Sequence, residues 1–122
     1  MNLNHLNLAV PDVAASRDFF VRFFGMRCTE TKGDNVLSVL VDDSGFILIF
    51  SNFQKDVSPA YPRDFHIGFL LDRVEVVNEL YETMTRAGVE IRPPKTAHGS
   101  WGFYVTAPGG ITVEVSSYEN GA

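Results

Sequence analysis

One order of sequence patterns occurs twice in this chain, and this repeat limits the possible folds more than any other feature. An apolar strand pattern at residues 3–10 precedes a helical pattern and three shorter strand patterns, and the same order restarts at residues 65–71. Matching landmarks are 60 to 65 residues apart: His5 and His66, Asp12 and Asp72, Gly25 and Gly88, Gly45 and Gly110. The sequence therefore predicts a duplicated unit of one strand, one helix and three strands, whose copies lie in one domain.

Capping residues and turn formers set the expected boundaries. Asp12 and Asp72 can cap the two helices, and Gly25 and Gly88 can end them. The later strands are expected at Arg27–Thr31, Val36–Val41, Phe46–Phe50, Glu90–Arg92, Gly102–Thr106 and Ile111–Ser117, with Pro93–Gly99 as a loop. A single domain at 1–122 is predicted, with module one at 3–50, a proline-containing linker at 51–63 and module two at 64–118.

Charge and apolar content exclude several classes of function. The ten basic residues are scattered among fifteen acidic ones, for a net charge of −5, which gives little support for nucleic-acid binding. No apolar run is long enough to span a bilayer, and the first residues do not resemble a secretory signal. Cys28 is the single cysteine, in agreement with a reducing compartment. The expectation is a cytoplasmic protein without membrane or nucleic-acid partners.

Two histidines and one glutamate are the candidate chemical groups. His5 and His66 occupy equivalent places in apolar strand patterns, and Glu114 lies at the centre of the last strand, where Ile49 is its counterpart in the first copy. Because strand side chains alternate, helices on the apolar faces would leave all three groups on the opposite, concave faces. Two imidazoles and a carboxylate can hold a divalent metal and leave coordination positions open. The competing interpretation is that each histidine is an ordinary hydrogen-bonded structural residue.

Three segments resemble the vicinal oxygen chelate superfamily, which includes glyoxalase I, bleomycin and fosfomycin resistance proteins and extradiol dioxygenases. They are His5–Val10, the helix pattern ending in Phe24-Gly25-Met26, and the run from Phe103 through Ala107-Pro108-Gly109-Gly110 to Glu114. The resemblance implies an α+β fold of two tandem βαβββ modules, with cupped, barrel-like mixed sheets and outer helices. It also implies one divalent metal ion per site, Fe(II), Mn, Zn or Ni, bound by His5, His66 and Glu114. Further implications are a substrate that chelates the metal through adjacent oxygens and a homodimer whose sites are shared between chains.

Departures from the family pattern leave the reaction open. Glyoxalase I has a fourth ligand where this chain has Ile49, so an isomerase would need another general base. A three-ligand site looks more like a dioxygenase or a fosfomycin-type thiol transferase. Asn7 in place of a usual threonine, and only Arg92 and Lys95 as nearby basic residues, weaken the fosfomycin alternative. A metal-free drug-sequestering protein of the bleomycin resistance type remains the alternative from another class.

Further residues are candidates for the surroundings of the metal. Tyr104 could donate a hydrogen bond to a metal-bound substrate oxygen, and His98 could act as a mobile acid or base. Asn7, Ile49 and Trp101 are expected to contact the substrate, with Ile47 and Ile49 favouring an apolar or aromatic ligand. Each has a structural alternative: a packed tyrosine, a solvent-facing loop histidine, and a tryptophan that fills space beneath a loop.

Overall fold

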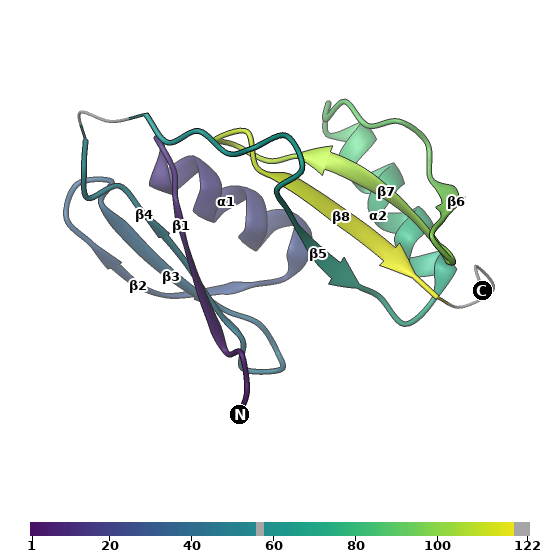
Figure 1. Cartoon of the computed structure of the whole chain (residues 1–122), viewed down its shortest axis with the longest axis horizontal. Coiled ribbons are helices and arrows are strands. Elements are labelled where there is room, and N and C mark those ends of the chain that lie inside the picture. The colour runs from purple at the N-terminus through teal and green to yellow at the C-terminus, as the bar shows by residue number, and fades with distance from the viewer. Residues whose placement is uncertain (56–57, 119–122) are drawn as a thin grey trace. The chain divides into compact units, whose positions relative to one another are not determined.

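The chain forms two compact units, each with one copy of the repeat. The computed structural model describes residues 1–55 and 58–118, and the units are Met1–Ala60 and Tyr61–Ala122. In each unit one helix lies along one face of a four-stranded mixed sheet (Figure 1). Both sheets are cupped and remain open, with an edge strand on each side. The predicted α+β class with two tandem βαβββ modules is confirmed.

Unit 1 is built on a sheet with the strand order β1-β4-β3-β2. Its elements are β1 (His5–Ala9), α1 (Val13–Phe24), β2 (Arg27–Lys32), β3 (Leu37–Val41) and β4 (Ile47–Ser51). As predicted, the Asp12 carboxylate caps α1, accepting from Ala15 N at 3.0 Å, and Gly25 ends it with a φ of 65°. Phe20 packs on Phe50 with ring centroids 5.1 Å apart, so the apolar face of the sheet is covered by α1.

Unit 2 repeats this arrangement with the strand order β5-β8-β7-β6. Its elements are β5 (His66–Leu70), α2 (Val74–Arg86), β6 (Lys95–Ala97), β7 (Ser100–Thr106) and β8 (Thr112–Ser117). Val77 and Met84 of α2 are buried, and Tyr81 contacts Phe103 of β7 at a centroid distance of 5.9 Å. The helix therefore covers one face of the sheet and leaves the other face open.

The registers of the two sheets show that the repeat extends to individual residues. His5 is opposite Ile47 in the parallel β1–β4 pair, and His66 is opposite Thr112 in the parallel β5–β8 pair. Two residue pairs further along, Ile49 lies opposite Asn7, and Glu114 lies opposite Gly68. Ile49 is thus the structural counterpart of Glu114, as the sequence spacing predicts.

The expected N-cap of the helix in unit 2 and the expected second strand of this unit are wrong. Arg73, not Asp72, is the N-cap of α2, and no side chain caps this helix end. The second strand of unit 2 is β6, inside the segment expected as a loop, whereas Glu90–Arg92 forms no strand. Pro93 and Pro94 explain the shift, because proline lacks a backbone N–H and restricts the residue before it, so pairing starts only after them.

Gly88 lies two residues beyond the last residue of α2, directly after the C-cap Ala87, and it still terminates the helix. The amide of Gly88 donates to the Thr85 carbonyl at 3.0 Å, and that of Val89 to the Met84 carbonyl at 3.0 Å. This is a Schellman ending, which requires the left-handed φ of 91° that Gly88 adopts. Among the described residues, neither helix has the length and apolar character that crossing a membrane requires.

Candidate active site

His66 and Glu114 meet on the open face of the unit 2 sheet. On β8, Val113 and Val115 are buried against α2, and Glu114 points the other way with 28% of its side chain exposed. The Nε2 atom of His66 lies 3.5 Å from Oε1 of Glu114. Two of the three predicted ligands are therefore brought together by the pairing of β5 with β8.

The ring of His66 is oriented by a backbone carbonyl. Its Nδ1 atom lies 3.0 Å from the Asp64 carbonyl oxygen, which can only accept, so Nδ1 carries the proton of this hydrogen bond. In the neutral imidazole, Nε2 then presents its lone pair to the side where Glu114 lies. Two lone-pair groups this close are stabilised by a shared proton or cation between them, and metal-ligating histidines are oriented in this way.

Tyr104 completes this cluster from the neighbouring strand. It lies directly opposite Glu114 in the antiparallel β7–β8 pair, and its ring centroid is 6.0 Å from that of the His66 ring. Desolvation raises the pKa of Tyr104, and the charge of the Glu114 carboxylate and its hydrogen bond with the phenol raise it further. The hydroxyl thus stays protonated and can donate at neutral pH.

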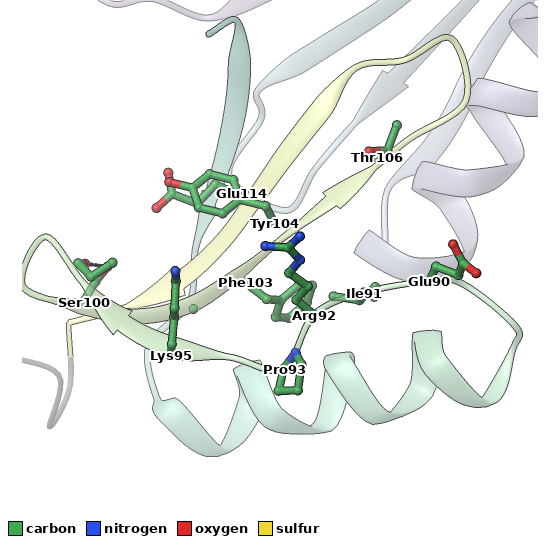
Figure 2. Close-up of a pocket in the computed structure, with 12 residues that line it drawn as sticks. Glu90, Ile91, Arg92, Pro93, Lys95, Ser100, Phe103, Tyr104, Thr106 and Glu114 are labelled. Atoms are coloured by element: carbon green, nitrogen blue, oxygen red, sulfur yellow. Dashed lines mark hydrogen bonds between the residues drawn. The ribbon is translucent and has the colours of Figure 1, made fainter. Parts of the chain in front are cut away.

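Two adjoining cavities reach the open face of unit 2. One has a volume of about 480 Å³, and its wall includes His66, His98, Tyr104 and Glu114. The other, shown in Figure 2, has a volume of about 390 Å³ and extends beneath the segment from Glu90 to Lys95. Ser100, Tyr104 and Glu114 line both cavities, so they lie where the two meet.

His98 reaches the first cavity from a tight turn between β6 and β7. His98 and Gly99 have positive φ values of 53° and 78°, as a two-residue type I′ hairpin turn requires. The predicted acid or base is therefore placed at the same cavity as His66 and Glu114.

Trp101 lies on the other side of the sheet from Glu114. Its indole Nε1 donates to Oδ1 of Asn78 on α2 at 2.8 Å, and Phe103 and Val105 on the same face of β7 are buried. This placement favours the interpretation of Trp101 as a packing residue over the expected substrate contact.

The candidate residues of unit 1 lie on the open face of its own sheet. Nδ1 of His5 is 2.8 Å from Oδ1 of Asn4, so the Nε2 atom of His5, like that of His66, is left for another partner. Oδ1 of Asn7 accepts a hydrogen bond from the Ser51 hydroxyl at 2.8 Å. Ile49 is half-buried between Asn7 and Val39.

His5 lies in unit 1, and His66 and Glu114 lie in unit 2. Across residues 1–55 and 58–118, no three His, Cys, Asp or Glu side chains are grouped so that they could hold a metal ion. The structure thus assembles two of the expected ligands within one unit, and the participation of His5 stays a prediction.

Sequence reasoning missed two parts of this site. Asp64 acts through its backbone carbonyl, which leaves no side-chain signature in the sequence. Ser100 lies on the same face as Gly102 and Tyr104, and strand alternation would have found it if the strand had been predicted to begin two residues earlier.

The sequence of residues 2–115 matches the Glyoxalase/Bleomycin resistance protein/Dioxygenase superfamily, so the chain belongs to this superfamily. None of the curated proteins matches it. Among solved structures, a possible glyoxalase from Bacillus cereus is 40% identical, with a TM-score of 0.85 over 95% of this chain and 98% of that chain.

Two more distant structures share the fold. A lactoylglutathione lyase from Agrobacterium tumefaciens is 19% identical, with a TM-score of 0.75 over 95% of this chain and 92% of that chain. A glyoxalase/dioxygenase from Nostoc punctiforme is 20% identical, with a TM-score of 0.78 over 95% of this chain and 90% of that chain. Members of the superfamily commonly use a divalent metal and act on small molecules.

Proposed function

We propose that this protein is a divalent-metal-dependent enzyme whose small substrate binds the metal through two adjacent oxygens, with dioxygenase-like or lyase-like chemistry. The observation that carries the proposal is the pair formed by Nε2 of His66 and Oε1 of Glu114, 3.5 Å apart. The Asp64 carbonyl at Nδ1 makes Nε2 the lone-pair atom of the neutral ring. An imidazole and a carboxylate in this arrangement fit a divalent metal.

His5 is the third ligand in this proposal, and its Nε2 is available for the same reason as that of His66. When bound, the metal supplies Lewis-acid polarisation and a template for the substrate oxygens. Iron(II), manganese, zinc and nickel all accept this ligand set.

Tyr104 and His98 are the residues that donate or accept protons in this proposal. The Tyr104 hydroxyl, which its raised pKa keeps protonated at neutral pH, can turn its one proton from Glu114 to a substrate oxygen in the cavity that both side chains line. His98, on the tight turn between β6 and β7, lines this cavity and can accept or deliver a proton. Asn7 and Ile49 contact the substrate from unit 1.

Metal analysis of protein prepared without chelators tests this proposal. Wild type should bind metal stoichiometrically after reloading, and His66→Ala and Glu114→Ala should lose it. Glu79→Ala is the matched control, because Glu79 is an exposed carboxylate on α2. Equal metal content in all four proteins would contradict the assignment.

Turnover then separates the reaction classes. Oxygen uptake with a panel of catechols, under iron(II) and then manganese, would identify a dioxygenase. Absence of uptake with retained metal would favour thiol or water addition, whereas tight drug binding in chelator-treated protein without turnover would favour sequestration.

The site is proposed to be shared within a homodimer in the cytoplasm. Small members of the resembling family usually exchange modules, so His5 of one chain would join His66 and Glu114 of the other. Mixing His5→Ala chains with Glu114→Ala chains should restore one intact metal site in each mixed dimer. A verified mixed dimer without metal would show that each chain builds its own site.

A further inference from the structure

We infer that Arg92 and Lys95 bind an anionic group, a carboxylate or phosphate, at the end of the substrate away from the metal. The part of this inference that places the other end of the substrate at the metal rests on the proposed function. Both side chains line the cavity of about 390 Å³ that adjoins the His66 cavity. Figure 2 shows the Arg92 guanidinium and the Lys95 ammonium on the side of the sheet where Tyr104 and Glu114 lie.

The fold sets the backbone positions of the two cations, whose side chains are exposed. Lys95 is the first residue of β6 and lies opposite Gly102 on β7. Arg92 precedes Pro93 and Pro94, which restrict the backbone that carries the guanidinium. Within residues 1–55 and 58–118, the salt bridges involve neither Arg92 nor Lys95, although four other basic side chains and His66 have acidic partners.

The surroundings of the cations favour an anion that belongs to a partly apolar molecule. Ile91, Pro93 and Phe103 contribute apolar surface to the cavity. Glu90 is at the opposite end of the segment from Lys95, as Figure 2 shows. Because Arg presents a planar fork of donors and Lys a point charge, the pair suits carboxylate or phosphate oxygens.

Sheet geometry sets the length of such a molecule. Lys95 is opposite Gly102, two residues before Tyr104, and Tyr104 is opposite Glu114. Strand spacing and rise put the Cα atoms of Lys95 and Glu114 roughly 12 Å apart. The substrate class is therefore a small aromatic or aliphatic acid with two adjacent oxygens at one end and the anionic group at the other.

The anion site can be tested on metal-free protein, independently of the proposed reaction. Calorimetric titration at low salt would compare 3-phenylpropionate, its methyl ester and 2-phenylethyl phosphate. We expect the anions to bind at least roughly tenfold more tightly than the ester, and Arg92→Ala or Lys95→Ala each to weaken them roughly tenfold. Arg86→Ala is the control, because Arg86 is on α2 and pairs with Glu82, and it should change nothing. The ranking of carboxylate and phosphate identifies the source of the anion.

The link to the metal end is tested on metal-loaded protein with catechol, 3-(3,4-dihydroxyphenyl)propionate and the methyl ester of that acid. Wild type should prefer the acid at least roughly tenfold, and the Arg92→Ala/Lys95→Ala double variant should lose this preference and keep its metal. His66→Ala should lose metal and still bind 3-phenylpropionate. Equal binding of acid and ester to wild type, or an unchanged preference in the double variant, would overturn the inference. A metal-free wild type would overturn the proposed function alone, because the first titration still decides the anion site.

Discussion

The open faces of the two sheets have the same backbone and opposite chemistry. Ile49 in unit 1 and Glu114 in unit 2 hold the same register position, between Val39 and Asn7 in one sheet and between Tyr104 and Gly68 in the other. Unit 1 keeps one histidine on an otherwise largely aliphatic face, whereas unit 2 surrounds its histidine with a carboxylate and a phenol. A duplicated fold can thus concentrate its chemistry in one copy, because side chains on the open face contribute little to the core.

Replacing Glu114 of unit 2 with isoleucine, its counterpart in unit 1, should have the strongest consequence. Glu114→Ile should weaken binding of zinc or manganese at least about a hundredfold. Loss of a residue that binds the metal directly should lower metal affinity more than loss of a residue that only orients a ligand. Calorimetric metal titration measures this. Unfolding of the metal-free variant should change little, since Glu114 lies outside the buried core. Metal affinity equal to wild type would remove Glu114 from the site.

The second effect concerns a close approach that unit 1 does not have. The pair of Leu37 and Ser51 in unit 1 corresponds to the pair of Gly102 and Ser116 in unit 2. A Cβ atom added to Gly102 would lie 2.2 Å from the Val115 carbonyl oxygen, which is a severe clash. Gly102→Ala should lower the free energy of unfolding by about 2–3 kcal/mol, because the β7 and β8 backbones must separate.

Chemical denaturation with Gly68→Ala as control isolates the steric cause. A Cβ on Gly68 meets its nearest atom at 3.7 Å, which is ordinary contact, so this variant should stay within about 1 kcal/mol of wild type. Equal losses in the two variants would mean that the cost is not the clash at Gly102.

Tyr104→Phe should have an intermediate effect, confined to catalysis. Val39 is its counterpart in unit 1, so the fold does not require a hydroxyl there. We expect kcat to fall roughly tenfold, with metal content unchanged, because one hydrogen bond to the substrate oxygen is lost. Steady-state kinetics measure it, and an unchanged kcat would assign Tyr104 to packing.

The smallest effect is in the turns that precede β4 and β8. Asp42 and Ala107 occupy equivalent positions in the two turns, because their amides donate matching hydrogen bonds to the carbonyls of Phe46 and Ile111. Only Asp42 also has a carboxylate. Its Oδ1 accepts from the Ser44 hydroxyl at 2.7 Å and from the amides of Ser44 and Phe46 at 2.9 Å. The Ser44 hydroxyl is the largest cause of the lowered pKa of Asp42. Asp42→Ala should destabilise unit 1 by about 1 kcal/mol at neutral pH.

The sign of the pH dependence follows from the lowered pKa. The stabilisation by Asp42 is fully present above the unfolded-state pKa of about 3.9 and disappears as the pH falls through the lower folded-state pKa. The difference between wild type and Asp42→Ala should therefore shrink as denaturation is repeated at pH values below about 4. A difference that is constant down to pH 2 would show that the carboxylate charge is not the cause.

Much of the fold follows from the sequence, because strand alternation and capping are local signals. The capping of α1 by Asp12, the end of α1 at Gly25 and the equivalence of Ile49 with Glu114 were all predictable. The position of β6 was not, since two prolines displaced pairing along the chain. The direction of Trp101 was missed for a related reason: alternation assigns it to the helix side only once β7 is known to begin at Ser100.

The candidate site was predictable as residue types, and less so as geometry. The sequence indicated His66, Glu114 and Tyr104, which the sheet brings together. It could not indicate that the Asp64 carbonyl orients the His66 ring, because any residue supplies that oxygen. The close approach at Gly102 depends likewise on how two backbones pack, which no single residue encodes.

The most direct test is anomalous diffraction from crystals of the zinc- or manganese-loaded protein. We expect a peak about 2.0–2.2 Å from Nε2 of His66 and from a carboxylate oxygen of Glu114, with Nδ1 of His66 still bound to the Asp64 carbonyl. A peak that is absent from this face of unit 2, or bonded to His66 through Nδ1, would contradict this expectation.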